Sequence, residues 1–202
     1  MQSIAPPHVA CSAAHPGASL EFHWDLFWVN LVPDSVAFVN ITVNGTSVVF
    51  EGSGYHDKNW GGYSFVPYLN QWYRGHGRVG EYTVVWLHRM DISGRITSSA
   101  YITKDSENLY SGCGDGIIVR PYGEGVTYPI PANSTAAVEG VTIYVDARNV
   151  GKFAFTTKQT SLVETLASGY WRWIGTFSGG LVGGLNSTGI ALWEQMGPFV
   201  EA

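Results

Sequence analysis

The sequence carries little charge, and the charge that it has forms no basic patch. Charged residues make up 13% of the 202 residues, and the 11 lysines and arginines are scattered along the chain. A protein that binds nucleic acid usually presents a basic face, so nucleic acid is not an expected partner. The chain also lacks a run of about 18 apolar residues, and we therefore expect no membrane span.

The beginning of the chain lacks the continuous apolar stretch of a secretory signal. Met1–Ala18 contains two early prolines and no such stretch, which predicts a cytoplasmic protein. We expect residues 1–18 to form a flexible arm, because chain ends without strand patterning are often poorly ordered. The remaining residues, 19–202, are long enough for one large β domain and are expected to form a single one.

Cysteines are few, and the common metal and nucleotide motifs are absent. The two cysteines, Cys11 and Cys113, predict neither a disulfide framework nor a zinc site. The sequence has no P-loop, no dinucleotide fingerprint and no nucleophile elbow. No set of His, Cys and carboxylate residues has the spacing of a metal site. The weak exception is His23 with Asp25, because the two share one strand face. We therefore expect no metal and no cofactor.

The sequence contains four Asn-x-Thr sequons, the acceptor motif for N-glycosylation. They begin at Asn40, Asn44, Asn133 and Asn186. Such sequons are modified only in a protein that enters the secretory pathway. Without a visible signal, they are interpreted as chance products of a β sequence rich in Thr, Ser and Asn.

Hydrophobic residues, aromatic residues and glycine are abundant. Hydrophobic residues make up 45% of the chain and aromatic residues 14%, and the chain has 25 glycines. Many short apolar runs separated by glycine turns predict about nine or ten strands at a spacing of 8–12 residues. This spacing fits a sandwich or a closed barrel. We favour an all-β, antiparallel, lipocalin-like barrel, because closure removes sheet edges and creates an interior for a ligand.

Local signals define some of the expected elements. Asn44-Gly45 between Ser35–Val43 and Thr46–Glu51 predicts a hairpin, since a type I′ turn needs positive φ at both central residues. Glu81–Met90 predicts a strand with high β propensity. Other expectations are a break at Pro33-Asp34, loops over residues 52–62 and 108–116, and one helix-permitting window, Thr160–Ala167.

Two polar and aromatic clusters are candidates for chemistry. Residues 52–62 place Tyr55, Asp57 and Asn59 in an expected loop bracketed by glycines, which could aim a phenol, a carboxylate and an amide into a cavity. We expect this loop to look into the barrel. The alternative is a tight turn whose polar side chains bind local backbone. Trp72–Arg78 mixes aromatics with cations, and its alternative is a surface hairpin with extended arginines.

Two further clusters follow from strand alternation. Trp86 and His88 lie two residues apart and therefore on one strand face. The alternative for this pair is an inward tryptophan and a hydrogen-bonded core histidine. Trp171 and Trp173 share one face of a strand, while Tyr170 and Arg172 share the other, and the sequence leaves open which pair points inward.

Long motifs connect the chain to a known family. These are PDS at Pro33–Ser35, GYHDKNWG at Gly54–Gly61, WYRGHGRVGEYTVVW at Trp72–Trp86, VRPYG at Val119–Gly123, and RWIGTFSGG with GIALWE at Arg172–Glu194. With them the chain resembles the lipocalin-like fungal Diels–Alderases. That family is distantly similar to bacterial carotenoid 1,2-hydratases of the hydroxyneurosporene synthase type and to AttH-like proteins. The resemblance covers most of the chain beyond about residue 20.

The resemblance implies a calycin-type barrel, in a chain of about half the usual family length. Members of the family usually hold two such barrels, with the substrate pocket at or near their junction. This chain has about half that length and is similar to the C-terminal half. Either a second barrel domain or a second copy of the chain supplies the missing wall as a partner, beside a small hydrophobic substrate, or this half binds the ligand in its own barrel, or it is inactive.

The resemblance also implies a function in fungal secondary metabolism, that of a cofactor-free pericyclase. Such an enzyme folds a polyene or a quinone methide for a Diels–Alder or hetero-Diels–Alder cyclisation and polarises its oxygen with a hydrogen bond. The alternatives are a non-catalytic carrier and a hydratase or dehydratase that uses Tyr55 and Asp57. Expected catalytic residues are Tyr55, Asp57 and His88. Expected substrate-binding residues are Asn59, Trp60, Trp72, Arg74, Trp86, Trp171 and Trp173.

Overall fold

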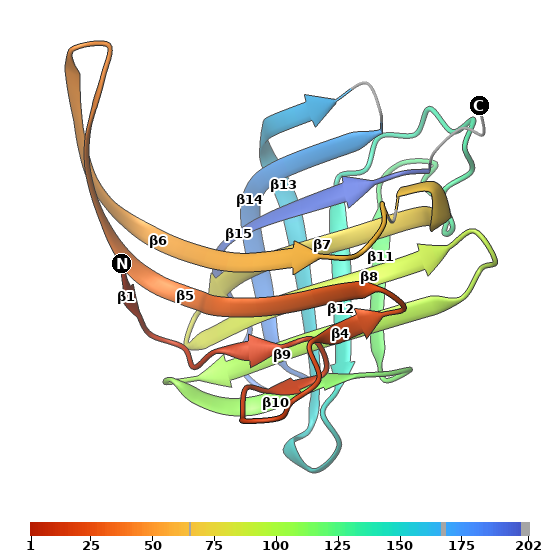
Figure 1. Cartoon of the computed structure of the whole chain (residues 1–202), viewed down its shortest axis with the longest axis horizontal. Helices are drawn as coiled ribbons and strands as arrows, with labels where there is room; N and C mark the ends of the chain where they lie inside the picture. Colours follow the sequence, from red (N-terminus) through yellow and green to blue (C-terminus); the bar gives the residue numbers. More distant parts are fainter. Residues whose placement is uncertain (65, 167–168, 199–202) are drawn as a thin grey trace.

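The computed structural model describes residues 1–64, 66–166 and 169–198, which form two antiparallel sheets (Figure 1). The larger sheet has nine strands in the order β10-β9-β8-β7-β15-β14-β13-β12-β11 within this described part. It curls into a nearly closed barrel, which confirms the expected all-β antiparallel barrel. Its strands are β7 (Leu69–Val79), β8 (Tyr82–Asp91), β9 (Ile96–Lys104), β10 (Glu107–Cys113), β11 (Ile117–Tyr122), β12 (Gly140–Asp146), β13 (Lys152–Leu166), β14 (Tyr170–Leu181) and β15 (Ser187–Met196).

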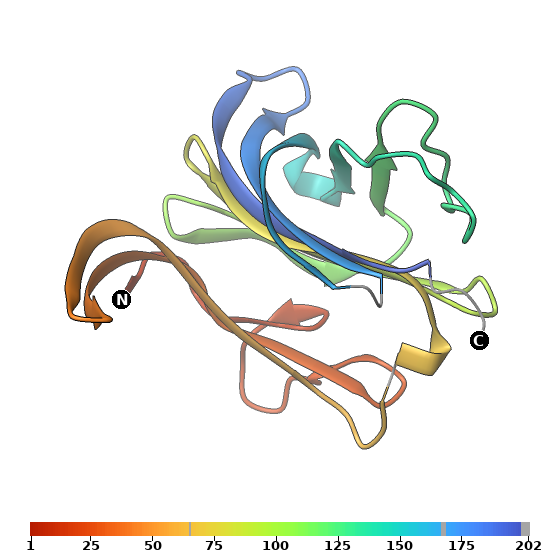
Figure 2. The same cartoon turned by 90° about the horizontal axis from the view of Figure 1, so that it is seen from above.

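The smaller sheet is built on a long hairpin of β5 (Leu26–Val43) and β6 (Thr46–Trp60). Figure 2 shows it as a separate layer against the wall of the barrel. The predicted turn is confirmed, because Val43 pairs with Thr46 and both Asn44 and Gly45 have positive φ, 48° and 80°. The tip of this hairpin extends beyond the barrel (Figure 1).

Two hydrophobic cores result from this layering. The first fills the barrel interior and includes Trp86, Phe155 and Trp193. The second lies between the hairpin layer and the outer barrel wall and includes Trp28 and Trp72. Strand β8 is buried along both faces, which explains its nearly continuous run of apolar residues.

The first 18 residues are not a free arm, and that prediction is wrong. Short strands β1 (Gln2–Ser3) and β2 (His8–Val9) pair with β5, and β3 (Ser12–Ala13) pairs with β2. Ala5, Val9 and Ala10 are buried, and this burial stabilises the segment. The remaining strand of this sheet, β4 (Glu21–His23), also pairs with β5. The barrel itself starts only at Leu69.

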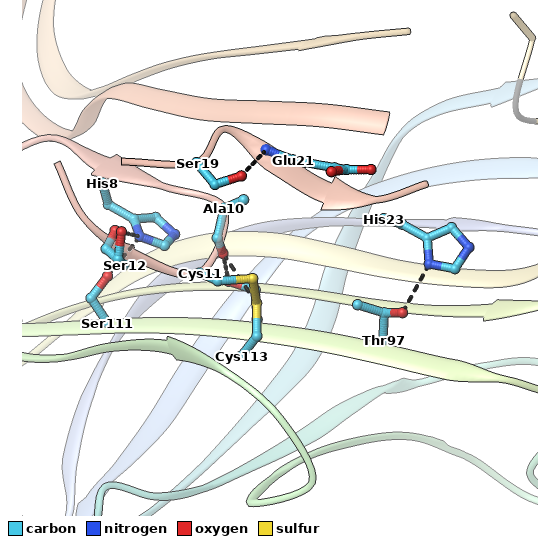
Figure 3. Close-up of a disulfide and its surroundings, with 11 residues drawn as sticks. His8, Ala10, Cys11, Ser12, Ser19, Glu21, His23, Thr97, Ser111 and Cys113 are labelled. Atoms are coloured by element: carbon cyan, nitrogen blue, oxygen red, sulfur yellow. Dashed lines mark hydrogen bonds between the residues drawn. A yellow bond between two sulfur atoms is a disulfide. The ribbon is translucent and has the colours of Figure 1, made fainter. Parts of the chain in front are cut away.

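The two cysteines form a disulfide, contrary to the sequence prediction. Cys11 lies just after β2 and bonds to Cys113 at the end of β10, 102 positions further along the chain (Figure 3). A contact beside it also joins the two segments, because His8 Nδ1 lies 2.9 Å from Ser111 Oγ. The sequence hides this link, since only the folded topology brings the segment before residue 18 onto the edge strand β10.

Strands replace three other expected features. Residues 52–60 belong to β6 and not to a loop, β10 covers most of the loop expected over 108–116, and β13 runs through the helix-permitting window up to Leu166. Ala167, which ends that window, lies outside the described residues. Two short 3₁₀ turns, η1 (Val66–Tyr68) and η2 (Arg148–Val150), are the helical elements of the described chain. None of its helices has the length and apolar character needed to cross a bilayer.

Pro33-Asp34 does not break the strand but lies at an irregularity within β5. The register of the β5–β6 pairing shifts between Val32 and Ser35, and a proline is tolerated at such a bulge because no ladder hydrogen bond needs its nitrogen. Asp34 is buried and accepts hydrogen bonds from Arg78 Nε at 2.8 Å and from Thr83 Oγ1 at 2.9 Å. The bulge thus anchors the hairpin to the barrel wall.

Candidate functional site

A row of charged side chains crosses the outer wall of the barrel. In the sheet register Arg74 of β7 pairs with Glu194 of β15, and Glu194 pairs with Arg172 of β14. Cross-strand partners point to the same face of a sheet, so strand pairing alone places a carboxylate between two guanidinium groups. Opposite this row, β6 presents Tyr55 and Asp57, which share one face because they alternate with the outward His56.

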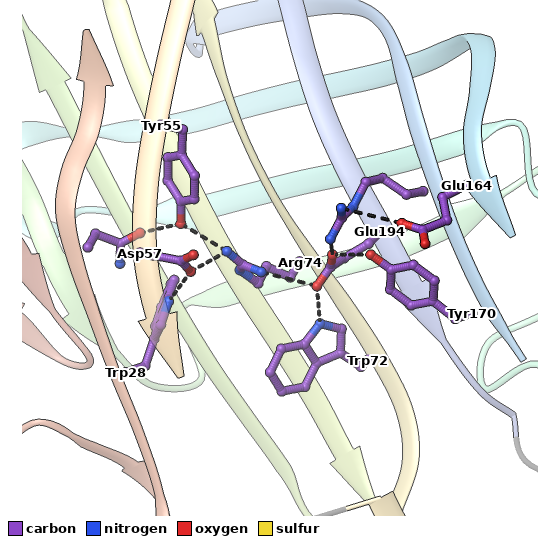
Figure 4. A network of polar contacts seen from close by, with 10 residues as sticks. Trp28, Tyr55, Asp57, Trp72, Arg74, Glu164, Tyr170 and Glu194 are labelled. Atoms are coloured by element: carbon purple, nitrogen blue, oxygen red, sulfur yellow. Dashed lines mark hydrogen bonds and ion pairs between the residues drawn. The ribbon is translucent and has the colours of Figure 1, made fainter. Parts of the chain in front are cut away.

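Glu194 is the centre of the row (Figure 4). Its Oε1 accepts hydrogen bonds from Arg74 Nη1 and Trp72 Nε1, both at 3.2 Å. Its Oε2 accepts from Tyr170 OH at 2.7 Å and from Arg172 Nη2 at 2.9 Å. The side chain is only 5% exposed, and the four hydrogen bonds stabilise this buried carboxylate.

Arg74 links this row to the hairpin layer. Its Nη2 donates to Asp57 Oδ2 and also lies 3.3 Å from the Tyr55 hydroxyl. Asp57 Oδ2 accepts a second hydrogen bond from Trp28 Nε1 at 2.7 Å. The Tyr55 hydroxyl donates to Asn30 Oδ1. The phenol, the carboxylate and the guanidinium therefore form one connected cluster between the two layers.

A cavity of about 350 Å³ opens onto this cluster. It is lined by Ser53, Tyr55, Asp57, Arg74, Gly75, His76, Arg172, Leu192 and Glu194. A second cavity of about 220 Å³ shares Ser53, His76 and Leu192 with it, and adds the apolar side chains of Ile174 and Ile190. The pair offers a polar end and an apolar end, as sites for small hydrophobic molecules do.

Burial sets the protonation of the groups in the site. It raises the pKa of Tyr55 well above its usual value, so the phenol stays protonated. Burial and the nearby Arg74 lower the pKa of His76 to about 3, so its imidazole, stacked 3.8 Å from the Tyr55 ring, is neutral. Burial alone would raise the pKa of Glu194, but Arg74, Arg172 and Tyr170 together bring it below the usual value.

Several hydrogen-bond donors at this interface have no partner within the described part of the chain. They are Arg74 Nε, Arg172 Nε, Asn30 Nδ2 and Asn59 Nδ2. A buried donor without a partner is costly to the fold. Among the residues that line the cavity, Tyr55, Arg74 and Arg172 carry O–H or N–H donors, so the site is suited to bind an oxygen of a neutral or partly negative ligand.

Comparison with known proteins agrees with the fold and the motifs. A family model described as Diels-Alderase-like matches residues 1–114, more than half of the chain. The chain belongs to the Diels-Alderase-like family. It is 36% identical over 197 residues to a quinolone epoxide rearrangement protein of Penicillium thymicola, and 32% identical over 197 residues to one of Emericella nidulans.

These matches cover 96% of this chain but only 54% and 53% of the two relatives, so the chain spans about half of their length. Among solved structures, that of CghA superimposes with a TM-score of 0.69 at 10% identity, over 95% of this chain and 58% of that one. At this identity the likeness shows the fold alone.

The structure brings together five of the residues predicted for a Diels-Alderase-like site. Tyr55, Asp57, Trp72 and Arg74 belong to the cluster described above, and Asn59 shares the face of β6 that carries Tyr55 and Asp57. Trp60 does not join them. It points to the other face of β6, is 36% exposed and stacks on Phe27 at 5.7 Å.

The other four predicted residues lie inside the barrel, on the far side of the wall. Trp86 is fully buried in the interior core, and Trp171 and Trp173 line a separate cavity of about 350 Å³. His88 Nε2 lies 2.6 Å from the Tyr128 hydroxyl and its Nδ1 2.8 Å from Ser98 Oγ. The prediction that the Tyr55 segment looks into the barrel is therefore wrong, since β7 separates the two regions.

Trp28, Asn30 and Glu194 of the cluster are not singled out by the sequence, whereas His76, Tyr170 and Arg172 lie in candidate segments but are not among the predicted site residues. Their common signal is that each occupies an alternate position in a strand whose opposite face is apolar, as Arg172 does between Trp171 and Trp173. The weak metal candidate is not supported, because His23 Nδ1 lies 3.1 Å from Thr97 Oγ1 while Asp25 binds backbone of residues 62 and 63. Across the described residues no three metal-ligating side chains gather.

Proposed function

We propose that the cavity between hairpin and barrel is the active site of a cofactor-free isomerase of fungal secondary metabolism, which cyclises or rearranges a small hydrophobic molecule. The family assignment supports cyclisation, and the relatives named for quinolone epoxide rearrangement support an oxygen-bearing substrate. Both reactions remake bonds within one molecule. They consume no external electrons, and a site of donors and apolar walls is chemically sufficient for them.

The observation that carries this proposal is the protonated Tyr55 phenol beside the Arg74 guanidinium in the cavity wall. Opening of an epoxide, or cycloaddition to a carbonyl-activated alkene, builds negative charge on oxygen. Fixed donors in a site with little water stabilise such charge more than water does. Arg74 would hold that oxygen, and Tyr55 would join it by turning its hydroxyl proton from Asn30 Oδ1 to the substrate, with Asp57 and Glu194 fixing the position of Arg74.

The apolar part of the cavity would supply the rest of the rate enhancement. Leu192, Ile174 and Ile190 form a surface on which a flexible hydrocarbon chain can be held folded. Fixing reacting carbons near each other removes the entropy that a free chain must lose before it cyclises. The polar end therefore orients the substrate, and the apolar end selects its shape.

The test uses a quinolone epoxide incubated with the 202-residue protein, with products separated by chromatography and mass spectrometry. We expect a new product of unchanged mass, formed more slowly by a factor of about 10²–10³ in Tyr55→Phe. Tyr63→Phe is the matched control, because Tyr63 is 75% exposed and outside the cavity lining. Equal rates in both variants, each folded, would contradict the assignment of Tyr55.

Hydration is the second candidate, because Tyr55 and Asp57 lie on one strand face at the same cavity. Oxygen-labelled water separates it from isomerisation, since a hydratase incorporates the label and gains the mass of water. Asp57 accepts hydrogen bonds from Arg74 and Trp28, an arrangement suited to orient a group rather than to donate a proton. A carrier would bind the epoxide and leave the product ratio unchanged.

The partner proposed for this chain is a second β domain that covers the apolar face of the projecting hairpin. Cross-strand pairs place Ile41 beside Val48 and Val43 beside Thr46 on that face. Ile41, Val43 and Phe50 are about half exposed there. Relatives nearly twice as long supply the additional chain for such a domain.

In the isolated chain, the same face would pair two copies. Light scattering should detect self-association that Ile41→Glu abolishes. A monomer at high concentration would argue against the surface.

A further inference from the structure

The four sequons are more numerous than chance predicts. The chain has nine asparagines, and Ser and Thr together account for 31 of its 202 residues. At that frequency about 1.4 of the asparagines would start a sequon, whereas four do so, and all four have threonine at the third position. The positions of the four asparagines in the structure can therefore test whether the sequons are chance products.

All four sequon asparagines are exposed and lie where an enzyme could reach them. Asn40 is on the projecting part of β5, and Asn44 is in the hairpin turn. Asn133 lies in the connection between β11 and β12, and Asn186 in the turn between β14 and β15. Of the five other asparagines, Asn30, Asn59 and Asn70 are buried or half-buried, whereas Asn108 and Asn149 are exposed.

The disulfide is an independent observation that points to the same compartment. Both cysteines of the chain are engaged in it. Protein disulfides form and persist in the lumen of the secretory pathway and outside cells, whereas the cytosol keeps thiols reduced. Cys11 and Cys113 fix the N-terminal segment onto β10, so their oxidation is part of the folded architecture.

We propose that this protein matures in the lumen of the secretory pathway and carries N-linked oligosaccharides at Asn40, Asn44, Asn133 and Asn186. At each site the amide Nδ2 forms a bond to the first sugar of a lipid-linked oligosaccharide. The bond between that sugar and the lipid pyrophosphate breaks, the amide loses a proton, and the lipid pyrophosphate leaves. The thiols of Cys11 and Cys113 lose two protons and two electrons to a luminal protein disulfide.

This proposal replaces the cytoplasmic location expected from the sequence, and it is compatible with the site and with the docking face. None of the four asparagines lines the cavity between hairpin and barrel. Asn40 pairs with Val49 and therefore points away from the face that holds Ile41 and Val48. An oligosaccharide at Asn40 would therefore extend away from that apolar face, and none of the four would start in the cavity lining.

The test examines the protein expressed from its own gene in its own host, detected on immunoblots before and after endoglycosidase treatment. We expect a slower native band that collapses to the size of the polypeptide. Single replacement of each sequon asparagine by glutamine should remove one of four steps in mobility. Asn108→Gln is the matched control, since Asn108 is exposed but starts no sequon.

A second measurement on the same sample reports the cysteines. Under denaturing conditions we expect no maleimide labelling before reduction and two labelled thiols after it. An unshifted band would overturn the proposed modification. Free thiols on a shifted band would overturn the argument that both features arise in one oxidising compartment. Neither readout depends on catalytic activity, so failure here is distinguishable from failure of the proposed function.

Discussion

Replacement of Glu194 by glutamine removes the charge at the centre of the buried network while keeping the size of the side chain. Two guanidinium groups, Arg74 and Arg172, then share a largely buried region in which Asp57 is the remaining close carboxylate of Arg74. Losing one partner of a buried ion pair costs about 3–5 kcal/mol. Because the Arg172 side chain is 35% exposed and water screens it, we expect the lower end, about 3 kcal/mol.

Urea unfolding near neutral pH measures this loss. With a slope of about 2 kcal/mol/M, the midpoint of Glu194→Gln should lie about 1.5 M below that of the wild type. Glu164→Gln is the matched control. Its carboxylate is 48% exposed and lies 3.6 Å from Arg172, so its loss should change the stability by less than about 0.5 kcal/mol.

The difference between wild type and Glu194→Gln should also depend on pH. The folded-state pKa of Glu194 lies below its usual value of 4.5, so the charge stabilises the fold above that pH. This contribution is lost as the pH falls through the folded-state pKa, and the two unfolding midpoints should converge there. Equal stability at neutral pH, or a gap that stays constant on acidification, would refute the account of the network.

Three further predictions concern packing, the disulfide and one histidine. A Cβ at Gly75 would lie 2.3 Å from Trp86 Cζ2, so Gly75→Ala should lower the free energy of unfolding measured in urea by at least about 1–3 kcal/mol. Gly52→Ala should be nearly neutral, because no atom would lie nearer than 3.9 Å to the new Cβ. Cys113→Ser should lower the unfolding free energy by about 2–4 kcal/mol and abolish the effect of a reductant on stability. His76, with a pKa of about 3 against 6.5 when unfolded, should show an unchanged NMR ring signal from about pH 7 to pH 5, and its burial as a neutral ring should lower stability as the pH falls below 6.5. Titration of the ring near its unfolded pKa would contradict the buried position.

Features set by local chemistry could be predicted from the sequence. The turn at Asn44-Gly45 follows from two neighbouring residues that tolerate positive φ, and the strand over 82–91 follows from its β-branched and aromatic run. Structure that depends on the pairing of two elements is harder to predict from the sequence. The glycine-bracketed segment after Glu51 looked like a loop, yet pairing with β5 holds it extended.

The candidate site depended on information that the sequence does not carry. Arg74 and Glu194 are 120 residues apart and meet because β15 is inserted beside β7 in the sheet. The side of the wall on which Tyr55 lies depends on the layer that the hairpin forms, and the bulge at Pro33-Asp34 anchors this layer through Arg78. The residue types alone therefore predict Tyr55 and Arg74 as site residues. They do not show that these two residues lie on one side of the barrel wall and His88 on the other.

Fluorine NMR of the protein with fluorotyrosine at position 55 or at position 128 tests the location of the active site most directly. Tyr55 lines the cavity between hairpin and barrel, whereas Tyr128 packs against the barrel-interior core and contacts His88. On addition of a quinolone epoxide we expect the signal at position 55 to shift and the signal at position 128 to stay unchanged. A shift at position 128 with none at position 55 would place the ligand inside the barrel and contradict the account.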